Sequence, residues 1–281
     1  MKQVLGLILC MILLGACGSE QTAQPTEEVV KAEETKKDKA SESKGDSMKE
    51  ETESQKHADQ QKKEKEELKK TEPMYELSNN WSFQPITSEG NAKVALLTID
   101  DAPDKHGLEM AKTLKSLEAP AIFFVNGHFI DTPEEAAQLK KIHELGFAIG
   151  NHTASHSSLP DLTKQEQHEE IVGLNDRIEA IIGERPKFFR APFGQNTEYS
   201  KHLAKEEGML VMNWTYGYDW DKEYMTEKAI ADIMVNTPLL ANGANLLMHD
   251  REWTANALDD IVSGLREKGF ELLNPDLIKT P

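Results

Sequence analysis

The strongest constraint on this chain is a repeated alternation of short apolar runs with amphipathic stretches, which begins near residue 94 and continues to the C-terminal end. A short apolar run bounded by turn residues is typical of a buried strand, and a longer amphipathic stretch is typical of a helix. Repeated strand–helix alternation indicates a parallel sheet with helical cover. We therefore predict an α/β fold, a distorted (β/α) barrel of about seven parallel strands that is closed or nearly closed.

The predicted elements follow one another in strict alternation. The predicted strands are 94–99, 121–125, 146–150, 187–190, 209–213, 245–248 and 270–273. The predicted helices are 106–117, a helix that opens with Pro133, a long helix over 163–182, and helices over 196–207, 224–236 and 253–268. Thr163 with Glu166 three residues later has the spacing of a capping box.

The charged residues of this 281-residue chain divide it into regions. Residues 18–72 contain 12 Lys and 16 acidic residues and no aromatic residue, so they cannot bury enough apolar surface to offset chain entropy. We predict a disordered tether over 17–72 and a single folded domain over 73–281, with a net charge of −14 out of −17 for the whole chain. Such an acidic chain is not expected to bind nucleic acid.

The N-terminal residues predict export. Met1 and Lys2 precede an apolar run over 4–14 that is too short to span a bilayer comfortably, which is typical of a signal peptide. Its end, Leu14-Gly15-Ala16-Cys17, resembles a bacterial lipobox. The signal peptide would then comprise 1–16, and lipidated Cys17 would anchor the protein to the extracellular face of a bacterial cell membrane. An ordinary signal peptide that happens to contain Cys is the alternative.

Polar residues gather where the predicted strands end, and in barrels of this kind the chemistry lies at those carboxyl ends. Five strand ends carry candidate residues: Asp100 and Asp101, His152 and His156, Arg190, Asp219 with Trp220, and His249. Each alone is a weak signal, but the coincidence of five predicts an active site.

Two of these segments suggest a metal centre. The four-residue spacing of His152 and His156 brings two imidazoles together if they share a helical turn, and an aspartate beside them completes a catalytic three-ligand set. Asp100 and Asp101 cannot both point the same way in a strand, so we expect one on the metal and the other beside it. Arg190 is a suitable partner for the carboxylate that is not a ligand. A simple Asp-Asp-Ala-Pro turn is the alternative.

The five strand-end segments resemble the motifs of the NodB-type polysaccharide deacetylases, carbohydrate esterase family 4. The resemblance covers residues 92–273. The similar segments are Thr98-Ile99-Asp100-Asp101-Ala102-Pro103, His152-Thr153-Ala154-Ser155-His156, Arg190-Ala191-Pro192-Phe193, Asp219-Trp220 and Leu247-Met248-His249. The resemblance implies that Asp101, His152 and His156 bind a divalent metal, usually zinc, with cobalt, nickel or manganese as alternatives.

The resemblance also implies the remaining roles. Asp100 would be the general base, oriented by Arg190, and His249 the general acid, held by Asp219. The backbone N–H of Phe193 would contact the oxyanion. Pro192, Trp220 and Leu247 would belong to the substrate pocket.

Three positions depart from the family pattern. Ala102 replaces the usual Gly, and its methyl group is expected to narrow the site slightly. Phe193 stands where Tyr is commoner, so a phenol contact is lost. Tyr216 stands where the family has an aspartate, which leaves the support of Arg190 open.

The function that these features predict is removal of N-acetyl groups from a glycan outside a bacterial cell. Peptidoglycan is the first candidate substrate, and a secreted N-acetylglucosamine polymer is the second. The alternatives are an O-acetyl polysaccharide esterase, a non-catalytic wall-binding lipoprotein and a solute-binding lipoprotein. The partners are thus a glycan and, through the lipid, a membrane, and no protein partner is predicted. Trp253, just after His249, is expected either to stack on a sugar or to pack in the core.

Overall fold

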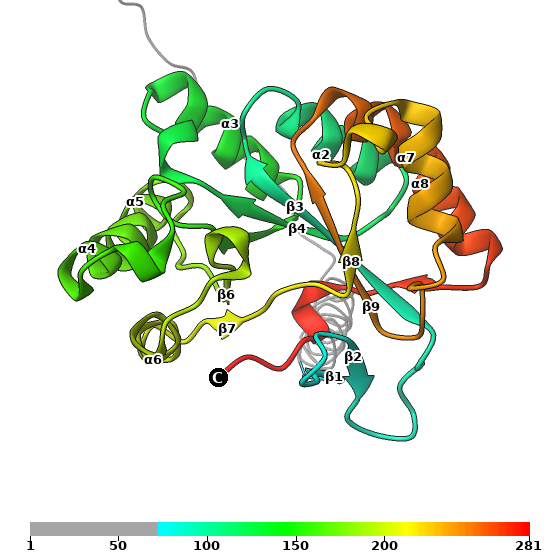
Figure 1. Cartoon of the computed structure of the whole chain (residues 1–281), viewed down its shortest axis with the longest axis horizontal. Coiled ribbons are helices and arrows are strands. Elements are labelled where there is room, and N and C mark those ends of the chain that lie inside the picture. Colours follow the sequence, from blue (N-terminus) through cyan, green and yellow to red (C-terminus); the bar gives the residue numbers. More distant parts are fainter. Residues whose placement is uncertain (1–71) are drawn as a thin grey trace, which may run out of the picture. The chain divides into compact units, whose positions relative to one another are not determined.

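The computed structural model describes residues 72–281, in which a parallel sheet is covered by helices (Figure 1). The predicted signal peptide, the lipidation site at Cys17 and almost all of the predicted tether lie outside the described residues. Among residues 72–281, no helix is long and apolar enough to cross a membrane.

The central sheet is parallel throughout and has the order β7-β6-β5-β4-β3-β9-β8, with β10 paired beside the beginning of β3. Its strands are β3 Val94–Ala102, β4 Ala121–Val125, β5 Ala148–Asn151, β6 Phe188–Phe189, β7 Leu210–Val211, β8 Tyr216–Gly217, β9 Ala244–His249 and β10 Glu271–Leu272. The seven strands of the continuous path curl into a half-barrel, and this confirms the predicted fold class.

Helices cover the outer face of the sheet (Figure 1). They are α2 Gly107–Ser116, α3 Pro133–Glu144, α4 Lys164–His168, α5 Leu174–Ile182, α6 Glu198–Glu206, α7 Glu227–Asn236 and α8 Glu252–Glu267. Alternate residues of β3 point to opposite faces: Leu97 and Ile99 join the core under the helices, whereas Val94 and Leu96 join a second core on the other face. Because successive side chains point to opposite faces and both faces are covered, β3 is buried on both sides, as is usual for a parallel strand.

The second core is closed by a hairpin that the sequence pattern did not predict. Strands β1 Tyr75–Leu77 and β2 Phe83–Pro85 pair antiparallel, and Tyr75 and Phe83 are buried against Leu96 and Phe124. Each strand has only three residues, which is too short for a periodicity signal.

Two predicted elements are divided in the structure. The helix expected over 163–182 has its predicted capping box, but a π-helical segment, Glu169–Gly173, separates α4 from α5. The strand expected over 209–213 ends at Val211, and the chain then crosses directly to the opposite edge of the sheet, where it forms β8. Asn213 lies in this crossing, and its carbonyl accepts hydrogen bonds from the Arg190 guanidinium and the Asn245 side chain.

We predict that Gly243→Ala will lower the free energy of unfolding by about 3 kcal/mol or more. Gly243 has a φ of +74°, and a Cβ there would overlap the carbonyl oxygen of Phe83. Relief of this overlap would lengthen or break the hydrogen bond that Phe83 N donates to Gly243 O at 2.8 Å. This bond fixes the position of β2. Urea denaturation would measure the loss.

Gly183→Ala is the matched control. Gly183 also has a positive φ, +88°, but a Cβ there meets no atom within 4 Å. This variant is therefore expected to lose only about 1 kcal/mol, the cost of the left-handed backbone. Equal losses in the two variants would contradict the packing argument.

Candidate active site

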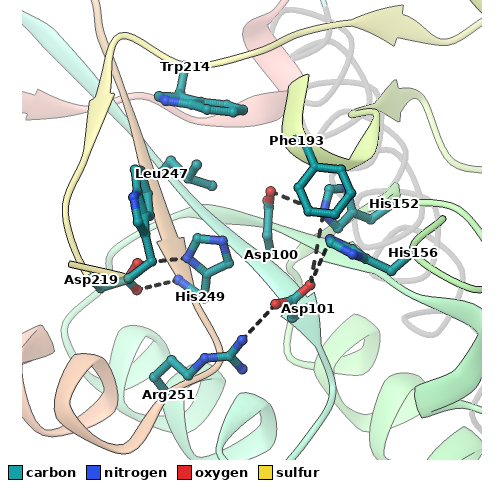
Figure 2. A pocket seen from close by; sticks show the side chains of 11 residues that line it. Asp100, Asp101, His152, His156, Phe193, Trp214, Asp219, Leu247, His249 and Arg251 are labelled. Atoms are coloured by element: carbon teal, nitrogen blue, oxygen red, sulfur yellow. Dashed lines mark hydrogen bonds and ion pairs between the residues drawn. The ribbon is translucent and has the colours of Figure 1, made fainter. Parts of the chain in front are cut away.

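Residues from all five predicted strand-end segments meet at one pocket with a volume of about 360 Å³ (Figure 2). Asp219 and Trp220 follow β8 rather than the strand predicted over 209–213, and the Arg190 segment reaches the lining through Phe193. It lies at the carboxyl ends of the parallel strands, as expected for this type of fold. It is lined by Asp100, Asp101, His152, His156, Phe193, Trp214, Asp219, Trp220, Leu247, His249 and Arg251.

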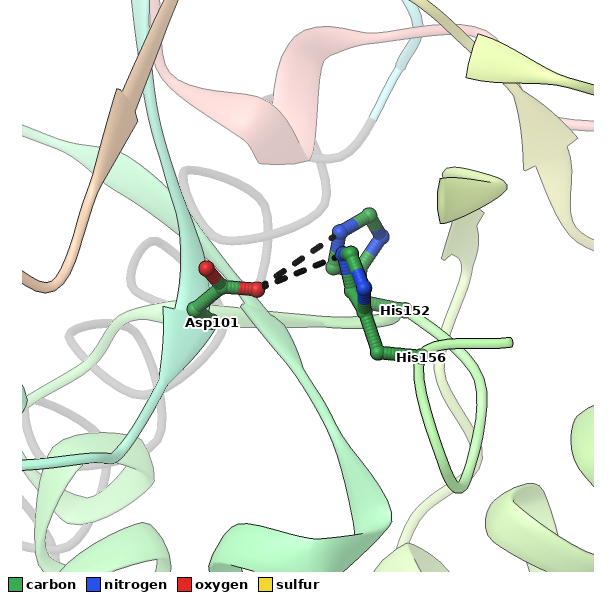
Figure 3. A group of neighbouring side chains, drawn as sticks. All are labelled: Asp101, His152 and His156. Atoms are coloured by element: carbon green, nitrogen blue, oxygen red, sulfur yellow. Dashed lines mark ion pairs between the residues drawn. The ribbon is translucent and has the colours of Figure 1, made fainter. Parts of the chain in front are cut away.

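Asp101, His152 and His156 form a group that could hold a metal ion (Figure 3). One ligand atom from each lies within 4.8 Å of the others. Asp101 Oδ1 faces both rings, at 4.0 Å from His152 Nε2 and 3.6 Å from His156 Nε2. The two histidines lie in the loop after β5, which is not helical, so the helical turn suggested by their spacing is wrong although their proximity is right.

The surroundings of this group fit a divalent metal. His152 Nδ1 lies 2.7 Å from the carbonyl oxygen of Arg190, which leaves Nε2 free to face the centre. Burial and the neighbouring His152 lower the pKa of His156, so its ring stays neutral and able to ligate. Burial opposes ionisation of Asp101, but the surrounding His249, His152, His156 and Arg251 outweigh it and lower the pKa of its carboxyl.

Asp100 is the carboxylate beside the metal group, and Arg190 holds it in place. The buried Arg190 Nη1 donates to Asp100 Oδ1 at 2.6 Å and to Thr98 Oγ1 at 2.7 Å. Its Nη2 donates to the Asn213 carbonyl at 3.0 Å. The other carboxylate oxygen, Asp100 Oδ2, lies 3.5 Å from His152 Nε2. The predicted partnership of Arg190 with Asp100 is therefore present in the structure.

His249 faces the pocket from the end of β9, and Asp219 fixes its ring (Figure 2). The two carboxylate oxygens of buried Asp219 lie 2.7 Å from His249 Nδ1 and 2.6 Å from His249 N. Thr254 Oγ1 also donates to this carboxylate, and Trp253 Nε1 donates to the Asp219 carbonyl. Trp253 packs against the core and does not line the pocket.

These contacts change the titration of His249. Burial would lower its pKa, but the hydrogen bond and charge of Asp219, together with the charges of Asp100 and Asp101, outweigh burial and raise it. A raised pKa keeps the ring protonated to higher pH. His249 therefore suits the role of a proton donor in the pocket.

Aromatic side chains border the pocket. Phe193 is 61% exposed and Trp220 is 50% exposed, whereas Leu247 is almost fully buried at the pocket wall. The Phe193 ring packs edge-on against His156, with 4.9 Å between centroids. Pro192 is buried beside Phe193 and does not line the pocket.

Two departures from the family pattern have structural outcomes. The Ala102 side chain is fully buried in the core under the helices, so the expected narrowing of the pocket is not found. Tyr216 is also buried, and its hydroxyl donates to the Met234 carbonyl at 2.8 Å. Arg190 obtains its partners from β3 and from the crossing segment instead.

Sequence reasoning missed Arg251, which lines the pocket. Arg251 Nη2 donates to Asp101 Oδ2 at 2.9 Å, on the side of that carboxylate away from the histidines. Asp250, next to it, is buried and accepts three backbone hydrogen bonds from residues 104–107. The only available signal was their position directly after His249 at a strand end.

We predict that Asp219→Asn will lower the pKa of His249, because the variant lacks the charge that holds its proton. Since the folded-state pKa is raised, this pairing stabilises the fold fully below the unfolded-state pKa of about 6.5 and is lost as pH rises through the folded-state pKa. The variant should lose about 2 kcal/mol of unfolding free energy at acidic pH and less at alkaline pH. NMR titration and urea denaturation at both pH values would test this.

Asp221→Asn removes an exposed carboxylate two residues away and is the control. It should leave the pKa of His249 unchanged. An equal pKa in the Asp219 variant and the parent would contradict the assignment of Asp219.

Comparisons with known proteins agree with this geometry. The family model described as polysaccharide deacetylase matches residues 87–212. The chain is 33% identical over 189 residues to a peptidoglycan-N-acetylglucosamine deacetylase of Bacillus cereus, covering 64% of this chain and 68% of that relative. It is 31% identical over 168 residues to the uncharacterized protein YlxY of Bacillus subtilis, but spans only half of that relative's length.

A solved structure shows the same relationship. The peptidoglycan deacetylase PdaC from Bacillus subtilis is 30% identical to this chain and has a TM-score of 0.59, with 66% of this chain and 89% of that chain covered. The chain therefore belongs to the polysaccharide deacetylase family, the NodB-type enzymes of carbohydrate esterase family 4.

Proposed function

We propose that the protein is a metal-dependent hydrolase that removes N-acetyl groups from peptidoglycan or a related N-acetylglucosamine polymer. The observation that carries the proposal is the arrangement around Asp100. His249 is its register partner on the neighbouring strand β9, while the Asp101–His152–His156 group lies on its other side (Figure 2). A base, an acid and a metal group thus face the same pocket.

The residues divide the reaction between them. A metal on Asp101, His152 and His156 would supply Lewis-acid polarisation of the acetamide carbonyl. Asp100, oriented by Arg190, accepts the proton of the attacking water. His249, kept protonated by Asp219, donates a proton to the leaving amine. Trp220 and Leu247 form the apolar wall for the acetyl methyl group.

The metal that we propose is zinc. Two imidazole nitrogens and one carboxylate oxygen are a common ligand set of catalytic zinc, and three protein ligands leave a coordination position open. The same donors also suit cobalt, nickel or manganese, so metal titration must decide between them.

We further propose that the domain acts outside the cell, anchored to the membrane by a lipid on Cys17. This part rests on the sequence Leu14-Gly15-Ala16-Cys17 after an apolar run. Mass spectrometry of the N-terminal peptide would detect a diacylglyceryl group on Cys17. A mature N-terminal peptide that carries no lipid on Cys17 would contradict the anchor.

We predict that Asp100→Asn and His249→Asn will each lower kcat for acetate release by 10²- to 10⁴-fold, because each variant loses one proton-transfer group. Both should still bind zinc, whereas Asp101→Asn should not bind it tightly. Acetate release and zinc titration are measured on the same samples. Asp104→Asn, outside the pocket lining, is the control and should match the parent.

The substrate is tested with zinc-loaded protein on three polymers: peptidoglycan, chitooligosaccharide and acetylated xylan. Acetate release from either N-acetylated glycan, with less from xylan, supports N-deacetylation. Release from xylan alone would indicate an O-acetyl esterase. If zinc-loaded protein releases acetate from none of them, the proposed function is wrong.

A further inference from the structure

We infer that Glu170 is a positioning residue for the metal-binding loop, and that the π-helical segment Glu169–Gly173 forms the support on which this loop is held. The inference rests on the proposed role of His152 and His156 as metal ligands. Glu170 lies outside the pocket lining and belongs to none of the motifs that the sequence suggested.

The metal-binding loop, residues 151–157, has a backbone that needs external support. Thr153 has a φ of +70° and His156 a φ of +60°, so two non-glycine residues occupy the left-handed region. Such conformations persist only where the surrounding structure determines them. In this loop one of the two strained residues is itself a candidate ligand.

The π-helical segment supplies that support through its main chain. The carbonyl of Ile171 accepts a hydrogen bond from the buried Asn151 side chain at 2.8 Å. The carbonyl of Glu170 accepts one from Ala154 N at 3.0 Å. Asn151 Oδ1 in turn accepts from Thr153 N at 2.9 Å, so the first strained residue is tied to the same support.

The Glu170 side chain completes the support next to the second histidine. Its two oxygens accept from Ser155 N at 2.8 Å and from Ser155 Oγ at 2.6 Å. Ser155 Oγ also lies 2.7 Å from Ser157 Oγ, so the residues on both sides of His156 are linked to one carboxylate. Loss of this carboxylate would release the peptide that precedes His156 while leaving all three candidate ligands in the chain.

The position of the π-helical turn along the helix agrees with a supporting role. Such turns are rare and occur often at functional sites. Here the turn interrupts an otherwise continuous helix from 164 to 182 where its carbonyls meet the metal-binding loop. The π-helical segment therefore contacts the metal-binding loop directly.

The test is zinc affinity of the full chain, measured by competition with a chromogenic chelator. Glu170→Ala should weaken zinc binding about tenfold, at the lower end for residues that orient metal ligands, because Ser155 is exposed to solvent. Glu170→Gln keeps hydrogen-bonding atoms at both positions and should stay within about threefold of the parent. Circular dichroism should give the metal-free Glu170→Ala protein a Tm within a few degrees of the parent.

Glu169→Ala is the matched control. Glu169 is exposed on the same turn, and its carboxylate contacts Gln165 rather than the loop. It should bind zinc as the parent does. Equal zinc affinity of Glu170→Ala and the parent would overturn the inference, as would a loss in Glu169→Ala of the same size.

Two further proteins keep the result interpretable. If Glu170→Ala does not fold, Ser155→Ala takes its place, because it removes only the hydroxyl contact to Glu170. Ser155→Ala should weaken zinc binding about threefold. Parent-like zinc affinity of this variant would overturn the inference. His156→Ala reports on the metal site itself. If parent and His156→Ala bind zinc equally weakly, the proposed metal site is wrong. If only the parent binds and Glu170→Ala matches it, the metal site stands and the role of Glu170 falls.

Discussion

The site depends on the hydrogen bonds and the ion pair made by the buried guanidinium of Arg190. A charge taken fully out of water is tolerated only when it is paired and hydrogen-bonded. Arg190 meets both conditions with Asp100 and Thr98 on β3 and the Asn213 carbonyl in the crossing segment, and it lies over the Phe124 ring, 4.3 Å from its centroid.

The same residue also links the base to the metal group. Its side chain orients Asp100, while its backbone carbonyl lies 2.7 Å from His152 Nδ1. One residue directly after β6 thus places two functional groups from different segments, Asp100 on β3 and His152 in the loop after β5. A shift of β6 would disturb both at once, which couples the packing of the sheet to the geometry of the site.

The sequence was sufficient to predict the parallel sheet and most of the residues that meet in the pocket. Short apolar runs recur with helices between them, and the carboxyl ends of parallel strands share one edge of the sheet. The polar residues that follow those runs therefore had to converge, as Asp101, His152 and His249 do. The roles of individual residues needed the family resemblance, because spacing alone does not distinguish a ligand from a base.

The features that the sequence did not predict depend on contacts between distant segments. Arg251 follows a strand end like many surface arginines, and only the fold shows that it reaches Asp101. The direct crossing to β8 has no apolar run long enough to indicate a strand. The π-helical turn also has no sequence pattern that would reveal it. Residues 163–182 keep an amphipathic pattern throughout, although the backbone hydrogen bonds change from α-helical to π-helical over Glu169–Gly173.

The pairing of β3 with β9 has a consequence for the nascent chain. Ala95 pairs with Ala244 and Asp100 with His249, so about 150 residues separate the paired residues of these two strands. Until β9 has been synthesised, one edge of the apolar strand β3 lacks its neighbour. Contacts of such long sequence separation form slowly, and an open apolar edge promotes association with other chains. The strand that carries Asp100 and Asp101 is thus the one that stays open until β9 pairs with it.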